Sequence, residues 1–413
     1  MNNSKTELRS SPLTWVIIIG LVYLLIGLVY LLMVGVGVVG AGFKWFSGGT
    51  EGAEMIFSFA TNPFVGVVLG TLATALVQSS STVTSVIVAL VAGGMPVEIA
   101  IPMVMGANMG TTITNTIVSL GNIGETKAFH RSFSAATVHD FFNLYAILIF
   151  LPLEIFFHPL QKIAGVMAHW FLDGRSVSIS DINVLSVIIK PVVVFLQGLF
   201  QSMPGTVDAI VFTVFGVALV FFSVLYMSKV LRSVMTTSTK ALLDKSLGKG
   251  VFIGILAGTV ITMIVQSSST TTSLLIPLAG AGVLSLRQIF PFTLGANIGT
   301  TITALLAATA IISGNKVFAL QIAFVHFLFN FLGVLLFVSV PWLYQLPIRS
   351  AEWLGELTER NKGYAFGYIF GVFFLIPGSI FGGQSILNDH NSKVVKAEQN
   401  TKQIHTVEKE LDE

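Results

Sequence analysis

The sequence lacks cysteine altogether and carries few charged residues. Without Cys, the chain cannot form disulfides, thiolate metal sites or a cysteine nucleophile. Asp, Glu, Lys and Arg make up only 10% of the 413 residues, whereas a soluble domain usually carries about 25% charged residues. The formal net charge of +2 is too small to argue for a nucleic-acid partner. The absence of Cys excludes a disulfide scaffold, and so low a share of charged residues indicates a chain that is soluble only in lipid.

Long apolar runs are what the sequence has instead, because 54% of its residues are hydrophobic. A helix that crosses a bilayer needs about 20 apolar residues, and the run from Leu13 to Ala41 meets this need without a charge. It is too long for a signal-peptide core and lacks a clear cleavage site, so we expect a retained span. Further runs cover 98–120, 133–156, 207–228, 288–312, 317–345 and 364–382. The run at 184–203 is borderline, because Lys190 and Pro191 lie near its start. The predicted fold class is an all-α, multi-pass integral membrane protein, with polar segments at 1–12 and 383–413 and no separate soluble domain.

Two other apolar runs, 55–97 and 250–284, are each broken at the centre by a polar cluster, and these clusters belong to an internal repeat. Segment 78–82, Gln-Ser-Ser-Ser-Thr, returns at 266–270; segment 106–114 returns at 295–303 as a second Gly-Ala-Asn-x-Gly-Thr-Thr-Ile-Thr. His139 and Asn143 return as His326 and Asn330. The offsets of 188, 189 and 187 residues keep these landmarks in register. The sequence therefore predicts two repeats, 13–206 and 207–382.

Internal repeats of transporters are commonly inverted across the membrane. Inversion requires an odd number of membrane crossings between equivalent segments. The number is odd if 184–203 lies along the membrane interface and even if it crosses. Whether 364–382, its approximate equivalent in the second repeat, crosses the membrane is open in the same way. Charge placement favours inversion: with a cytoplasmic N-terminus and three spans per repeat, the outside segments hold only Lys44, Lys162, Arg175, Lys190 and Lys316. This asymmetry obeys the positive-inside rule and places both termini in the cytoplasm. The basic stretch 229–249 is then interpreted as a cytoplasmic loop.

The polar clusters predict a binding site at membrane depth. Lipid cannot hydrogen-bond a backbone, so a polar break there must line a cavity in the protein. We expect 55–97 and 250–284 to be re-entrant helical hairpins whose tips are the Gln-Ser-Ser-Ser segments, with a second arm that starts at the hydroxyl cluster. Hydroxyl residues favour N-caps, and helix N-termini attract anions. Two such tips would surround a small oxyanion with neutral donors, since neither segment contains Lys or Arg. The candidate phosphate-binding residues are Gln78, Ser79, Ser80, Ser81, Thr82, Gln266, Ser267, Ser268, Ser269 and Thr270.

Sodium is a hard cation that binds oxygen, and the repeated Gly-Ala-Asn segments supply amide and hydroxyl oxygens beside glycines that permit unwound backbone. The candidates from this pattern are Asn108, Thr111, Thr112, Asn297, Thr300 and Thr301. Other interpretations stay open. Membrane Ser and Thr often bond the carbonyl of the preceding turn, the glycines also suit close helix packing, and His139 and His326 are expected to form interhelical hydrogen bonds rather than to bind a metal.

At these duplicated segments the sequence resembles the type II sodium–phosphate cotransporters of animals and bacteria, over about 55–345. The resemblance implies sodium-driven uptake of inorganic phosphate, inverted repeats with two re-entrant hairpins, and a plasma-membrane (bacterial inner-membrane) location. It also implies that the tips shape nearby sodium sites, which adds Gln78, Ser81, Ser85, Gln266, Ser269 and Ser273 to the sodium candidates. The stretch 157–206 is shorter than the disulfide-bearing loop of the animal members and has no Cys.

The resulting hypothesis is a sodium-coupled phosphate symporter that works by alternating access, with no cofactor other than sodium as co-substrate. Phosphate, sodium and membrane lipids are the expected partners, and a homodimer is left open. Alternatives are a carrier for another small oxyanion, coupled to sodium or uncoupled, a phosphate exporter, and a channel. A membrane enzyme is disfavoured, because no Gly-x-Ser-x-Gly elbow follows a strand and the histidines lie far along the chain from each serine cluster.

Overall fold

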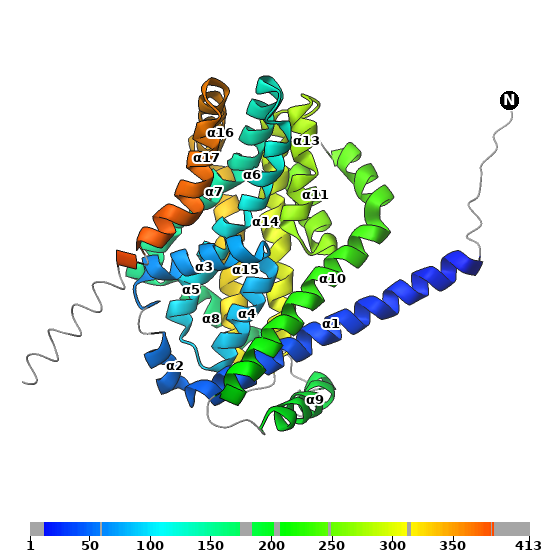
Figure 1. Ribbon diagram of the computed structural model, residues 1–413, viewed down its shortest axis with the longest axis vertical. Coiled ribbons are helices and arrows are strands. Elements are labelled where there is room, and N and C mark those ends of the chain that lie inside the picture. The colour runs from blue at the N-terminus through cyan, green and yellow to red at the C-terminus, as the bar shows by residue number, and fades with distance from the viewer. Residues whose placement is uncertain are drawn as a thin grey trace, which may run out of the picture.

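The computed structural model describes residues 12–57, 60–173, 184–201, 207–246, 249–311, 315–380 and 382–383. Within these ranges every regular element is a helix (Figure 1), which confirms the all-α prediction. Six helices are long and apolar enough to cross a membrane: Ile19–Ser47, Thr126–Phe157, Val207–Val230, Leu286–Thr309, Lys316–Ser339 and Gly363–Ile380. The molecule is therefore a multi-pass membrane protein, as composition indicated. The polar segments 1–12 and 383–413 lie almost wholly outside the described residues.

Several predicted spans differ from the helices that form. The run at 98–120 divides into α5 (Val97–Thr111) and α6 (Ile113–Ser119) at Thr112, so neither helix alone reaches the crossing length. The run at 317–345 ends early, because α15 (Lys316–Ser339) stops before Pro341, and proline suits the first turn of a new helix but not a helix interior. The borderline run forms only the short α9 (Val184–Phe200). The stretch 229–249, interpreted as a loop, is helical as far as Ser246.

The helices follow one another in the same order in the two halves of the chain. The first half contains α1 (Pro12–Ser47), α3 (Pro63–Val77), α4 (Ser80–Gly93), α5, α6, α7 (Thr126–Phe157), α8 (Pro159–Asp173) and α9. The second contains α10 (Val207–Ser246), α11 (Val251–Val265), α12 (Ser268–Ser273), α13 (Leu275–Gly280), α14 (Leu286–Thr309), α15, α16 (Pro341–Arg360) and α17 (Gly363–Phe370). Short α2 (Thr50–Ile56), the 3₁₀ turn Leu120–Asn122 and the π-helical turn Gly371–Leu375 complete the described elements. The order of elements thus repeats along with the sequence motifs.

Glycine allows the same close helix contact in each half. Helix α3 packs on α5, and α11 packs on α14. A Cβ atom on Gly106 would overlap the carbonyl of Val67, and one on Gly295 would overlap that of Ile255. Beside these contacts Thr71 donates to the Gly106 carbonyl at 3.2 Å, and its equivalent Thr259 donates to that of Gly295 at 3.1 Å. Small residues at such crossings let helix backbones approach closely in a membrane, so packing explains part of the glycine pattern.

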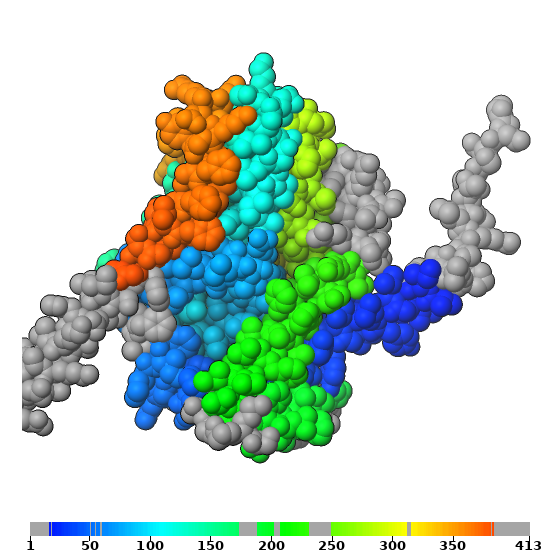
Figure 2. All heavy atoms as spheres, viewed as in Figure 1, coloured from blue at the N-terminus to red at the C-terminus, as the bar shows by residue number. Residues whose placement is uncertain are grey.

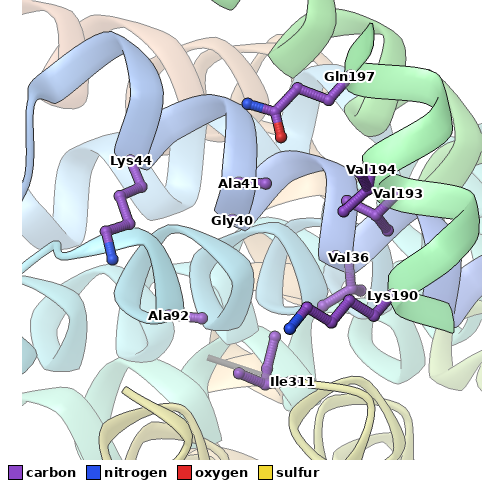
Figure 3. Close-up of a pocket in the computed structure, with 11 residues that line it drawn as sticks. Val36, Gly40, Ala41, Lys44, Ala92, Lys190, Val193, Val194, Gln197 and Ile311 are labelled. Carbon is purple, nitrogen blue, oxygen red and sulfur yellow. The ribbon is translucent and has the colours of Figure 1, made fainter. Parts of the chain in front are cut away.

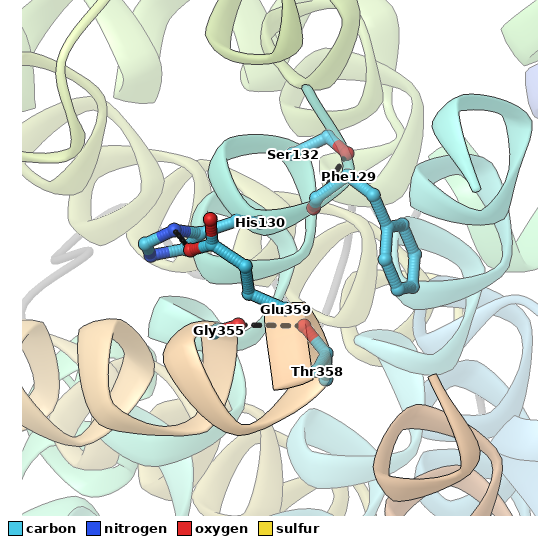
Figure 4. Close-up of polar contacts among 6 residues, drawn as sticks. All are labelled: Phe129, His130, Ser132, Gly355, Thr358 and Glu359. Carbon is cyan, nitrogen blue, oxygen red and sulfur yellow. Dashed lines mark hydrogen bonds and ion pairs between the residues drawn. The ribbon is translucent and has the colours of Figure 1, made fainter. Parts of the chain in front are cut away.

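The two halves also exchange contacts. Helix α8 packs against α15 of the other half, and α16 packs against α7. At the latter contact His130 pairs with Glu359 at 2.9 Å (Figure 4), and Gly355 gives room to the Ser134 hydroxyl. Helix α1 lies along α10, and the surface of α10 runs diagonally across the face shown in Figure 2. The two halves thus form one packed unit, and the site described next is lined by residues of both halves.

Candidate functional site

Each serine cluster lies at a break between two helices. Helix α3 ends at Val77 and α4 begins at Ser80; α11 ends at Val265 and α12 begins at Ser268. The residue at each break, Gln78 or Gln266, has left-handed backbone angles near φ 56°. Glycine fits this conformation far better than a residue with a side chain, so a glutamine at both breaks points to a role for the side chain.

A serine caps the helix that follows each break. Ser79 and Ser267 are in extended conformation, and their hydroxyls accept from the backbone N–H of Thr82 and Thr270, respectively, both at 3.2 Å. This is the N-cap arrangement that the hydroxyl clusters predicted. In α4 the backbone N–H groups of Ser80 and Ser81 belong to the first turn and have no partner within the helix. They remain as donors at a helix end that carries partial positive charge.

Both breaks line one cavity of about 340 Å³. All ten predicted phosphate-binding residues contribute to its wall. Helix α10 closes another side with Phe221, Val224, Leu225, Ser228 and Lys229, and Thr114 adds a further hydroxyl. The serine clusters, 188 residues apart in the sequence, are thus brought together around a single hollow.

The hydroxyl groups of Ser80 and Ser268 are the best placed to bind a ligand. Both residues are only 3% exposed and both line the cavity, yet neither hydroxyl makes a hydrogen bond to another described residue. By contrast, Ser79 bonds Thr82 at 2.8 Å and Ser267 bonds Thr270 at 2.9 Å. Because both residues line the cavity and neither hydroxyl is engaged by a described residue, this equivalent pair is available for an oxyanion.

The two glutamines differ in their partners. The Gln266 side chain is fixed, because its oxygen accepts from Thr303 at 2.6 Å and its amide donates to the Met263 carbonyl at 2.5 Å. Gln78 is exposed and lines the cavity, and its side-chain amide makes no hydrogen bond to another described residue. The repeats are therefore equivalent in backbone but not in side-chain bonding.

The predicted sodium candidates that carry a hydroxyl group fall into two groups. Ser81 and Thr300, from different repeats, meet at 3.2 Å between their hydroxyl oxygens. Most of the others bond a carbonyl of their own helix, which is the alternative role that we expected for Ser and Thr in membrane helices. These are Ser85, Thr111, Thr112, Ser273 and Thr301, and Ser269 instead contacts Ser267. Among the described residues no three His, Asp or Glu side chains lie together as a metal cluster.

Asn108 and Asn297 lie outside the cavity wall, where each connects with the other repeat. His139 contacts the Asn297 side-chain oxygen at 2.5 Å, and Asn297 donates to Asn143 at 2.7 Å. In the matching arrangement His326 contacts the Asn108 oxygen at 3.4 Å. The expected interhelical hydrogen bonds of the two histidines are confirmed. The sequence did not indicate that each histidine binds the asparagine of the opposite repeat.

Lys229 is the charged residue of the cavity wall that sequence reasoning missed. It lines the cavity from α10, and its ammonium group lies 5.0 Å from the centre of the Tyr226 ring. None of the other residues that line this cavity is charged. The donors of the two polar segments are neutral, as predicted, but a cation from a third helix faces the same space. The sequence analysis had placed Lys229 in the cytoplasmic loop 229–249, because that stretch is basic.

Comparison with known proteins gives three findings. The family model described as Na+/Pi-cotransporter matches residues 31–172 and 219–345. The sodium-dependent phosphate transport protein 2B of Homo sapiens is 33% identical over an alignment 412 positions long; the match covers 79% of this chain and 59% of that protein. The sodium-dependent phosphate transport protein 2A of Rattus norvegicus is 31% identical over 388 residues, with 78% and 61% covered. The chain thus spans about three fifths of the length of these relatives, and no solved structure matches it.

Proposed function

This chain belongs to the Na+/Pi-cotransporter family, and from that premise we propose that it moves inorganic phosphate into the cell together with sodium ions. The observation that supports this most is the shared cavity, where two equivalent helix breaks present free hydroxyl groups. A tetrahedral oxyanion needs several donors from different directions. Ser80, Ser268 and the amide of Gln78 supply them.

The bound anion would lie between the breaks, with α4 pointing its N-terminal N–H groups at it. Lys229 compensates part of the anion's charge, and co-bound sodium ions compensate more. Ser81 and Thr300 form the best candidate sodium position, because they bring two hydroxyl oxygens from opposite repeats beside the cavity. The histidine–asparagine bonds hold the helices that carry these residues, so we assign Asn108 and Asn297 a positioning role rather than direct contact with phosphate.

For the transport cycle we propose two inverted repeats, 13–206 and 207–382, each with a re-entrant hairpin. Support comes from Figure 1, where α4 runs through the lower half of the molecule and α13 reaches its upper end. Contacts agree with this: Gly93, at the end of α4, lies against Gly40 and Phe43 near the end of α1, whereas Gly280, at the end of α13, accepts from Arg131 near the start of α7. Inverted repeats provide two access routes to one site, as alternating access in the plasma membrane requires.

Uptake into proteoliposomes tests the function. The purified chain is reconstituted, and entry of labelled phosphate is followed with an inward sodium gradient and with an equal potassium gradient. We expect uptake only with sodium, and competition by unlabelled phosphate but not by sulfate. Equal uptake with potassium would contradict sodium coupling, and stronger competition by sulfate would assign a different oxyanion.

A further inference from the structure

A second cavity, of about 290 Å³, lies apart from the one between the helix breaks. It is bounded by α1 and α9, by Ala92 near the end of α4 and by Ile311, which follows α14 (Figure 3). Its wall is mainly apolar, with Val36, Val193, Val194 and Ile311 among the contacts. Nothing in the proposed transport of phosphate uses this cavity.

Two lysines distinguish this cavity from an ordinary gap between membrane helices. Lys44 extends from α1 and Lys190 from α9, and Ala92 lies between their ammonium groups in Figure 3. No acidic residue lines the cavity, and neither lysine forms an ion pair with another described residue. Both lysines are exposed, and an anionic group placed between two positive charges is attracted to each of them. The cavity therefore suits a molecule that has both an anionic group and an apolar body.

The surroundings of the cavity resemble a membrane–water interface. Trp45 follows Lys44 near the end of the candidate span Ile19–Ser47 and packs edge-on against Phe212 at 6.4 Å between ring centres. Trp and Tyr concentrate at the level of lipid headgroups. The apolar part of α9, Ile188–Phe200, is too short to cross a bilayer. A helix of this kind lies more readily along the interface.

We propose that this cavity binds an anionic phospholipid, with the headgroup phosphate between Lys44 and Lys190 and an acyl chain along the valines of α1 and α9. The lipid would connect α1 and α9 with α4, the helix that begins at the first serine cluster, because Ala92 lies near the end of α4. Asn315 holds that end by donating to the Ala92 carbonyl at 3.2 Å. A lipid bound there stabilises the position of α4 against the outer helices.

Native mass spectrometry of the purified full-length chain tests this proposal. Phosphatidylglycerol and phosphatidylcholine with identical acyl chains are titrated separately, and inorganic phosphate is added as a competitor in a third series. We expect phosphatidylglycerol to bind roughly tenfold more tightly than phosphatidylcholine, because each lysine near the headgroup adds attraction for an anionic lipid. Millimolar inorganic phosphate should not displace it, since the acyl chain contributes to binding.

Matched variants locate the site. Lys44→Gln with Lys190→Gln should remove the preference for phosphatidylglycerol, Lys44→Arg with Lys190→Arg should retain it, and Lys162→Gln, an exposed lysine on α8 away from the cavity, should leave it unchanged. Equal binding of both lipids by the unaltered chain would overturn the proposal even if the double variant failed to fold. Displacement by inorganic phosphate alone would also overturn it, by assigning the lysines to free phosphate. Because uptake is not the readout, failure here leaves the proposed transport function unaffected.

Discussion

Gln78 and Gln266 show how much a residue can differ from its equivalent in the other repeat. Both adopt a left-handed backbone conformation, but only Gln266 has hydrogen-bond partners for its side chain among the described residues. The sequence predicted both as ligands, because it shows two identical motifs. It could not distinguish them, since the difference arises from Thr303 on α14, which reaches only one of the two glutamines.

This difference predicts opposite effects for one substitution. Gln78→Gly should leave thermal stability unchanged or slightly raised, because glycine adopts the left-handed conformation without strain, while phosphate uptake falls through loss of the free amide. Gln266→Gly should lower stability by about 1–3 kcal/mol, because Thr303 loses its buried partner. Thermal unfolding in detergent and proteoliposome uptake measure the two effects. A loss of stability in Gln78→Gly as large as in Gln266→Gly would contradict this assignment.

Lys229 is the one charge in the cavity wall, and its removal should weaken phosphate binding. For Lys229→Met we expect the KM for phosphate to rise about three- to tenfold, as loss of one partly solvated attraction predicts, with a smaller change in the maximal rate. Lys229→Arg keeps the charge and should stay within about twofold of the unaltered chain. If Lys229→Met kept its KM, phosphate would not sense this cation.

At the scale of elements, the sequence predicted the helix breaks and their hydroxyl caps well, because both follow from local chemistry. Ser79 and Ser267 cap the helices in which the clusters lie. Prediction was weaker where packing decides. Thr112 divides one predicted span, although its counterpart Thr301 lies inside the continuous α14. Near-identical segments thus form a broken helix in one repeat and a continuous helix in the other, and hydropathy alone does not predict this difference.

The close contact between α3 and α5 gives a prediction at the same scale. Gly106→Ala should destabilise the folded protein by about 1–3 kcal/mol, because the added methyl group has no room beside Val67. Gly295→Ala should act alike at Ile255 in the second repeat. Gly367→Ala on α17 is the control: nothing lies within 4 Å of its Cβ position, so stability should hold or rise by up to about 1 kcal/mol. Thermal unfolding of the three variants would refute the packing role if all behaved alike.

At the scale of the whole molecule, the repeat was visible in the sequence but the exchange between its halves was not. Helix α8 packs on α15 and α16 on α7, and each histidine of the repeated pair contacts the asparagine of the other half. Offsets between motifs show that two units exist. They carry no information on which surface of one unit contacts the other.

Inversion of the repeats is a prediction that cysteine labelling can test, because the chain has no cysteine of its own. Glu98 and Arg287 occupy equivalent positions near the starts of α5 and α14, and both are exposed. In oriented membrane vesicles, Glu98→Cys and Arg287→Cys should react with a membrane-impermeant maleimide from opposite sides. Labelling of both from the same side would show parallel repeats and remove the basis for two access routes to one site.

Phosphate uptake by serine variants tests most directly the claim that one anion lies between both helix breaks. Sodium-driven uptake into proteoliposomes is compared for Ser80→Ala, Ser268→Ala and the control Ser223→Ala, whose hydroxyl bonds only the Leu219 carbonyl of its own helix. We predict that each of the first two variants loses at least about tenfold in KM or rate, as expected when one hydrogen bond to a charged ligand is removed, and that Ser223→Ala resembles the unaltered chain. Normal uptake by both Ser80→Ala and Ser268→Ala, in protein that unfolds at the normal temperature, would contradict the account.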